Sequence, residues 1–89
     1  MSLDFPNPSR CFEAKKNRIR FWGYDSAIEI TFFISVETLL KICPGTGEDE
    51  ASLLAAFDLA LEQVHMVASQ VYKRSRTFSY AHLLTNEDF

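Results

Sequence analysis

Residues 18–34 read RIRFWGYDSAIEITFFI, and this stretch decides the fold. Apolar and polar side chains alternate on both sides of Asp25-Ser26, which is typical of strands with one buried face. A two-residue turn at Asp25-Ser26 would pair Phe21 with Ile30, so that the apolar side chains of both strands share one face. A three-residue loop would set Phe21 against Glu29 and mix the two faces. The pattern therefore predicts an antiparallel hairpin.

The same reasoning adds a strand before the hairpin. A turn at Lys16-Asn17 places Phe12 opposite Phe21 and Glu13 opposite Arg20, and Asn17 tolerates the positive φ that a tight turn needs. The result is an antiparallel meander of three strands. Its predicted inner face holds Phe12, Ala14, Ile19, Phe21, Ile28, Ile30, Phe32 and Ile34.

The second half of the chain has helical periodicity. Ser35 can cap a short helix over residues 36–43, which Pro44 and Gly45 would end. Residues 46–49 (TGED) then fit a capping box. One long helix is predicted from about Glu48 to Arg74, nearly 40 Å at ~1.5 Å per residue, and residues 77–84 alternate well enough for a fourth strand. The apolar stripe of the long helix is Leu53, Leu54, Phe57, Ala60, Leu61, Val64, Val67, Ala68, Val71 and Tyr72.

These elements predict an α+β fold in one domain over residues 1–89. We expect an antiparallel meander of three to four strands, with one long C-terminal-half helix packed on one face and a short helix between. A chain of 89 residues buries roughly 60% of its unfolded surface, whereas 47% of its residues are hydrophobic. This surplus of apolar surface favours an oligomer.

The charge of the chain is uneven. Residues 1–24 carry five basic and two acidic side chains, whereas residues 25–70 carry one basic and eight acidic. A net charge of −3 makes a poor general binder of nucleic acid, although a local basic patch remains compatible with the asymmetry.

The cysteines and the N-terminus predict a cytoplasmic protein. Cys11 and Cys43 match no paired metal or redox spacing, so we expect two reduced thiols rather than a disulfide. Residues 1–6 lack the basic and apolar regions of a secretory signal. No apolar run approaches the ~20 residues that a membrane-spanning helix needs.

Three side chains could carry chemistry, and for each we prefer a structural role. Cys11 would need a base and an electropositive setting to act as a nucleophile, and nothing in the sequence ties a histidine to it. His65 falls on the polar side of the long helix near Glu62, where solvent is expected; these two groups are fewer than the three ligands that zinc needs. His82 is expected on a sheet face, with a pH-sensitive contact as the alternative. The acidic run 48–50 suits a helix start rather than a calcium loop. We therefore expect no catalytic, metal or cofactor site.

The outer face of the predicted sheet is the strongest candidate for a binding surface. Basic groups alternate there with aromatic rings, as in single-stranded nucleic-acid platforms, where bases stack on rings and cations meet phosphates. The alternative is a face covered by another element or a second subunit, with Arg20 paired to Glu13, because aromatic residues and arginine also mark protein interfaces. We prefer the second interpretation, since Glu13 and Glu29 would repel phosphate. The candidate residues are Arg18, Arg20, Trp22, Tyr24 and Phe33, with Lys15 and Thr31 beside them.

A second candidate surface lies on the long helix. Leu59 and Met66 are seven residues apart and opposite the core stripe, so solvent would meet both in a monomer. A long helix with a second apolar strip can pack on its symmetry mate, and two-fold dimers are the commonest assembly. Leu59 and Met66 are therefore candidates for self-association.

Five segments together resemble a known family. They are FPN at 5–7, IRFWGYD at 19–25, EITFFI at 29–34, AAFD at 55–58 and LLTNEDF at 83–89. In this order they are similar to the bacterial domain-of-unknown-function family 1488. The resemblance implies a stand-alone bacterial α+β protein with strands followed by a long helix, and it implies no activity and no functional residue.

The sequence as a whole predicts a small cytoplasmic accessory or interaction protein that is not an enzyme and that self-associates, as a homodimer. The alternative is a small regulatory protein that contacts nucleic acid through the basic and aromatic outer sheet face. An enzyme built around Cys11 is a third hypothesis. We expect no cofactor and no membrane partner, and the residues point to no small molecule.

Overall fold

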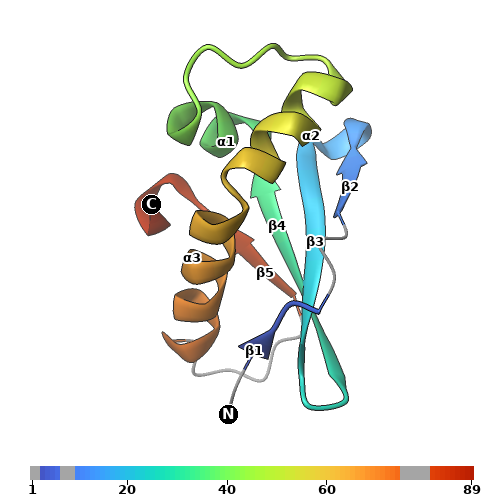
Figure 1. Ribbon diagram of the computed structural model, residues 1–89, viewed down its shortest axis with the longest axis vertical. Helices are drawn as coiled ribbons and strands as arrows, with labels where there is room; N and C mark the ends of the chain where they lie inside the picture. The colour runs from blue at the N-terminus through green and yellow to red at the C-terminus, as the bar shows by residue number, and fades with distance from the viewer. Residues whose placement is uncertain (1–2, 7–9, 75–80) are drawn as a thin grey trace.

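Alternation of polar and apolar residues produces the two longest strands, β3 (Arg18–Asp25) and β4 (Ile28–Ser35). The computed structural model describes residues 3–6, 10–74 and 81–89. In these residues β3 and β4 form the centre of a five-stranded sheet with β1 (Leu3–Asp4), β2 (Arg10–Glu13) and β5 (Ala81–Leu84). Three helices, α1 (Val36–Ile42), α2 (Glu50–Leu59) and α3 (Leu61–Arg74), cover one face of the sheet (Figure 1). The predicted α+β class is confirmed.

The pairing of β3 with β4 is displaced by two residues from the predicted register. Phe21 pairs with Phe32 rather than with Ile30, and the turn lies at residues 26–27, where Ser26 has a φ of 57°. A displacement of two residues returns every side chain to the same face. Phe21 and Ile30 are accordingly both buried on the helix side, as the alternation predicted.

The pairing of β2 with β3 is also displaced by two residues. Phe12 pairs with Ile19 and Glu13 with Arg18, because a short 3₁₀ helix, η1 (Ala14–Lys16), takes the place of a two-residue turn. Asn17 follows it with a φ of 52°, the left-handed conformation expected of this residue. Ala14 is therefore exposed in η1, and Ile28 is 50% exposed at the tip of the hairpin, so both were wrongly assigned to the inner face.

Strand β1 was not predicted. It pairs with β3 on the same edge as β2, through Leu3 with Asp25 and Asp4 with Tyr24. Gly23 lets residues 4 and 5 pass close to β3, because a Cβ at position 23 would lie 2.8 Å from both the Phe5 ring and the Asp4 carbonyl oxygen.

The predicted long helix is two helices whose axes differ by 74°. Ala60 separates α2 from α3, and neither Pro nor Gly stands at the bend. A straight helix of about 40 Å would exceed the longest dimension of the molecule, 36 Å. The bend instead lets Phe57 of α2 and Val64 of α3 both enter the core, where each is fully buried.

The helix starts agree in part with the predicted caps. Ser35 Oγ accepts a hydrogen bond from the Thr38 amide at 3.2 Å, as expected for the cap of α1. The cap of α2 is Asp49 rather than Thr46: its carboxylate accepts from the Ser52 amide at 3.0 Å and from Ser52 Oγ at 2.7 Å. These hydrogen bonds lower the pKa of Asp49.

The final strand differs in direction from the antiparallel meander. β5 pairs parallel with β4, through Phe32 with His82 and Ile34 with Leu84, because the chain returns to the sheet through the helices as a crossover. Residues 77–80 of the predicted strand lie outside the described part of the chain. A short 3₁₀ helix, η2 (Asn86–Asp88), follows β5.

The core lies between the sheet and the helices. Phe21 is its centre, with ring centroids 5.4 Å from Phe32 and 5.2 Å from Phe57. Two polar contacts tie the helices to the sheet: Arg10 of β2 binds both carboxylate oxygens of Asp58, and the Tyr72 hydroxyl donates to Asp25 at 2.5 Å. The buried hydrophobic residues are Ile19, Phe21, Ile30, Phe32, Ile34, Val36, Leu39, Leu53, Ala56, Phe57, Val64, Val67, Ala68 and Leu84.

Candidate functional site

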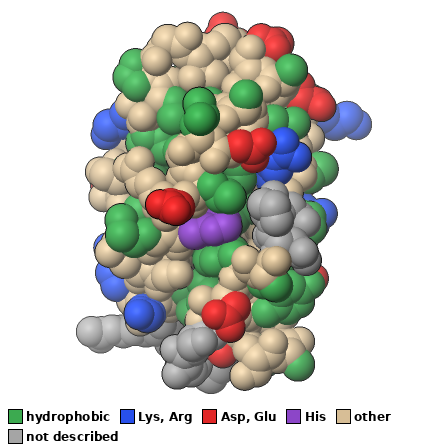
Figure 2. All heavy atoms as spheres, viewed as in Figure 1, with side chains coloured by type: hydrophobic (Ala, Val, Ile, Leu, Met, Phe, Trp, Pro, Cys, Tyr) green, Lys and Arg blue, Asp and Glu red, His purple; other side chains and the backbone are tan. Residues whose placement is uncertain are grey.

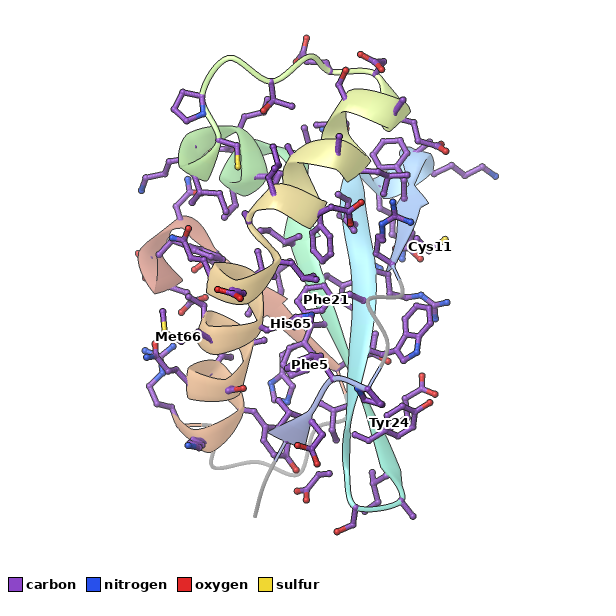
Figure 3. The ribbon with its side chains drawn as sticks, viewed as in Figure 1. Phe5, Cys11, Phe21, Tyr24, His65 and Met66 are labelled. Atoms are coloured by element: carbon purple, nitrogen blue, oxygen red, sulfur yellow. The ribbon has the colours of Figure 1, made fainter. Side chains whose placement is uncertain are left out.

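The face of the sheet that points away from the helices is the candidate site, and we call it the outer face. Residues that alternate with the buried ones along β3 and β4 point to it. Figure 3 shows Tyr24 and Cys11 on this side, whereas Phe5 and Phe21 lie between the sheet and α3. The outer face carries Cys11, Glu13, Arg18, Arg20, Trp22, Tyr24, Glu29, Thr31, Phe33, Leu83 and Asp4.

Arg18 is the more strongly engaged of the two arginines. Its Nε donates to Glu13 Oε1 at 2.6 Å, and its guanidinium carbon lies 3.6 Å from the centroid of the Phe33 ring. The hydrogen bond from Arg18 lowers the pKa of Glu13. We had expected Glu13 to pair with Arg20, and that expectation was wrong because β2 is displaced by two residues along β3.

Within the described part of the chain, Arg20 is held by stacking and not by a carboxylate. Its guanidinium carbon lies 5.1 Å from the Trp22 ring centroid, within the range of a cation–π contact. Its Nε is buried and has no hydrogen-bond partner within the described ranges. A buried donor without an acceptor costs free energy, so this Nε lowers the stability of the fold unless a residue outside the described ranges accepts from it.

Apolar side chains surround the arginines. Trp22 and Phe33 are half-buried, and Leu83 of β5 stands beside Phe33 with 53% of its surface exposed. Lys15 was predicted on this face, but it is exposed in η1 beyond the end of the strands. Leu83 was not predicted, because the pairing of β5 with β4 could not be derived from its short alternation.

The sheet separates Cys11 from both histidines. Cys11 is an exposed thiol on the outer face, where it pairs with Arg20 of β3. His65 and His82 lie on the other side of the sheet, where His82 stacks on Phe32 at 5.5 Å. A histidine therefore cannot act as the base for this thiol without a rearrangement of the sheet.

His65 is not the solvated residue that its helical position predicted. Its ring stacks on Phe5 with 3.9 Å between centroids and 6° between planes, and it lies beside Phe21 as well. Burial lowers its pKa. Figure 2 shows a histidine at the surface among hydrophobic side chains, where Figure 3 labels His65.

The second predicted surface, Leu59 and Met66, is exposed, but its two residues lie on different helices. Leu59 is 90% exposed and Met66 57% exposed, and in Figure 3 the side chain of Met66 points away from the sheet. The two residues lie on helices whose axes differ by 74°, so they do not form one straight strip.

A shallow hollow of about 380 Å³ lies between the start of α1 and the end of β5. Its polar groups are bound to one another, because Ser35 Oγ donates to Thr38 Oγ1 and Thr38 Oγ1 donates to Asn86 Oδ1. These contacts anchor the C-terminal segment to α1.

The described residues contain neither a candidate metal-binding cluster nor a single helix that could span a membrane. No group of three or more His, Cys, Asp or Glu side chains there could hold a metal ion. No single described helix is long and apolar enough to cross a membrane, and α2 and α3 meet that test only as a bent pair.

The comparison with protein families identifies one match. Residues 3–83 match the family described as "Protein of unknown function (DUF1488)", and the chain belongs to this family. The resemblance inferred from the sequence segments is thereby confirmed. No curated protein and no solved structure matches the chain.

Proposed function

We propose that this member of a family without an assigned activity is a non-enzymatic interaction protein of the bacterial cytoplasm that self-associates through its outer face. The observation that carries the proposal is the layer arrangement of the described residues. The three helices cover the same face of the sheet (Figure 1), and half-buried aromatic rings occupy the other face. Aromatic residues and arginine are enriched in the cores of protein interfaces.

The state of the arginines favours a protein partner over a polyanion. The charge of Arg18 is matched by Glu13, and the flat side of its guanidinium is used by Phe33. The carboxylates of Glu29 and Asp4 at the other end of the face would repel phosphate. Interface cores, by contrast, use arginine in such stacked, partly desolvated positions.

Sedimentation velocity over about 1 µM to 1 mM, where weak dimers dissociate, tests this proposal. The variant Leu83→Glu places a charge in the apolar part of the outer face, and Leu59→Glu places the same charge on the helices. We expect dimers for the wild type and for Leu59→Glu, and monomers for Leu83→Glu, with circular dichroism showing all three folded.

Two results would overturn the proposed self-association through the outer face. A wild-type chain that stays monomeric over the whole range has no self-association to explain. A dimer that Leu59→Glu or Met66→Glu dissociates, and Leu83→Glu leaves intact, would assign self-association to the helices.

A second candidate function is contact with single-stranded nucleic acid through Arg20 and Trp22. It is favoured by the guanidinium of Arg20, which lies beside the Trp22 ring, on which a base could stack. Trp22 is the only tryptophan of the chain, so its fluorescence reports binding directly. Phosphate contacts would give an affinity for an oligonucleotide that falls steeply with salt. Unchanged Trp22 fluorescence at low salt would exclude this function.

A further inference from the structure

The outer face is polarised along its strands, and its charges lie in rows of paired residues. One row contains Cys11, Arg20 and Phe33, the next contains Trp22 and Thr31, and the third contains Asp4, Tyr24 and Glu29. Arg20, which has no ion pair with a carboxylate among the described residues, therefore lies on one side of Trp22, and two exposed carboxylates lie on the other.

We infer that two copies of this chain pack outer face to outer face about a two-fold axis that crosses the strands at the row of Trp22 and Thr31. This inference rests on the proposed self-association and adds the partner's orientation. A two-fold axis in this direction reverses the strands of the second copy and keeps their lateral order. Arg20 then faces the partner's Tyr24, between the partner's Asp4 and the partner's Glu29.

The alternative two-fold axis runs parallel to the strands, and electrostatics argue against it. That axis would superimpose each row on its own copy, so that Arg20 would meet the row of the partner's Arg20. The row that contains the carboxylates of Asp4 and Glu29 would likewise meet the same row of the partner. Opposed like charges are costly at an interface, whereas the crossing axis matches opposite charges at both ends.

The Arg20 guanidinium fits the crossing axis for a second reason. Its Nε is enclosed within one copy, so a partner can reach only the other nitrogens of the guanidinium. The crossing axis brings two carboxylates of the other copy toward them, and an arginine–carboxylate pair forms charge-assisted hydrogen bonds. Trp22 and Thr31, which lie on the axis, would meet their own copies and exclude water from the centre.

The area of the outer face sets the expected affinity of the dimer. The outer-facing residues of β3 run from Arg18 to Tyr24, about 20 Å, and neighbouring strands lie about 4.8 Å apart. A face of that length and four strands wide is at the small end of specific interfaces, so we expect a dissociation constant on the order of 10–100 µM. Because rim charges contribute, this constant should rise with salt concentration.

Charge reversal tests the geometry. Arg20→Glu and Glu29→Arg each create a like-charge contact across the axis, and each should weaken the dimer by about tenfold or more. The double variant Arg20→Glu/Glu29→Arg restores opposite charges and should regain affinity to within a few-fold of the wild type. Glu62→Arg, on the exposed side of α3, is the matched control and should leave the constant unchanged.

A crosslink locates the axis independently of charge. In a Cys11→Ser background, Thr31→Cys places a thiol on the axis, and a short bismaleimide should join two copies, because packed sheets lie about 10 Å apart. Gln63→Cys, exposed on α3, should not crosslink, and the background alone controls for Cys43. These variants also keep the test informative if a charge reversal impairs folding.

The outcomes separate this inference from the proposed function. A monomeric wild type would remove both. A wild-type dimer that survives both single reversals, or that does not crosslink through Thr31→Cys, would overturn the crossing axis while self-association stands. Loss of the dimer in both single variants with recovery in the double variant, together with the Thr31→Cys crosslink, would support it.

Discussion

Phe57 and Leu59 lie two residues apart in α2, and their environments are opposite. Phe57 is fully buried against Phe21, with 5.2 Å between ring centroids, whereas Leu59 is 90% exposed. Sequence periodicity assigned both correctly, because two residues along a helix rotate a side chain by about 200°, from the core side to the solvent side.

The substitution Phe57→Ala should therefore lower the free energy of unfolding by about 3–5 kcal/mol, since it leaves a cavity among aromatic rings. That is a large part of the stability of so small a domain. Leu59→Ala is the control and should change the free energy of unfolding by less than about 0.5 kcal/mol. Urea unfolding measures both, and equal effects of the two substitutions would place Phe57 outside the core.

His65 shows what periodicity could not predict at the level of a residue. Its helical position faces away from the core stripe, and solvent was the reasonable expectation. The ring of Phe5, which belongs to a segment sixty residues earlier in the chain, covers it. No local pattern announces such a contact.

Stability should depend on pH through His65. Burial lowers its pKa in the folded state, so the unfolded chain, with a value near 6.5, binds the proton more readily. The stabilisation that neutral His65 contributes to the folded state is therefore full above about pH 6.5, and it is lost as the pH falls through and below that value. Urea midpoints of the wild type should drop between pH 7.5 and 5.5, and those of His65→Phe should drop less. Parallel curves would contradict the assignment.

At the scale of elements, the start of α2 shows how one sequence fits two caps. Residues 46–49 match a capping box, but Asp49 with Ser52 three residues later forms the cap that the structure uses. Thr46 instead closes the preceding turn, where its Oγ1 donates to the Cys43 carbonyl at 2.7 Å. Composition alone does not choose between overlapping caps.

Asp49→Ala should lower the melting temperature by several degrees, because the first amides of α2 lose their acceptor. Glu48→Ala, next to it and exposed, should have little effect. Because hydrogen bonds lower the pKa of Asp49, its contribution should persist to acidic pH and disappear as the pH falls through that lowered pKa. An equal loss for Glu48→Ala in calorimetry would indicate general charge at the helix start rather than a cap.

The strands were predictable in type and face but not in register. Alternation fixes which side Phe21 and Arg20 occupy, and a displacement by two residues leaves that side unchanged. The register depends on turn geometry. Here a three-residue 3₁₀ helix replaced one predicted turn, and the other two-residue turn moved by one residue to Ser26-Ala27. The bend at Ala60 was not predictable either, because no Pro or Gly marks it in the sequence.

At the scale of the whole molecule, the layer of helices on one face of the sheet was predicted, whereas the pairing of the outer strands of the sheet was not. Two central strands and an amphipathic helical half specify a sheet with helices on one face. β1 is too short for its pattern to be seen, and β5 is parallel because the helices carry the chain back across the sheet. The outer face could therefore be predicted for β3 and β4, whereas Asp4 and Leu83 on its borders could not.

Native-state hydrogen exchange should reflect this arrangement. Amides in the middle of β3 and β4, which have neighbouring strands on both sides, should open only with global unfolding. β1 contributes two paired residues and should open at a lower free energy. Phe5→Ala should accelerate exchange in β1 and leave β4 nearly unchanged. Equal acceleration in both strands would mean that β1 is part of the global folding unit.

The division of one sheet edge between β1 and β2 has a consequence for assembly. β1 covers residues 24–25 and β2 covers residues 18–21 of β3, so neither strand presents a long continuous edge, and β5 at the opposite side has only four residues. Fibrous growth requires strands to add along such an edge indefinitely. The pair proposed above, formed through the outer face, would therefore leave no long strand edge along which further copies could add.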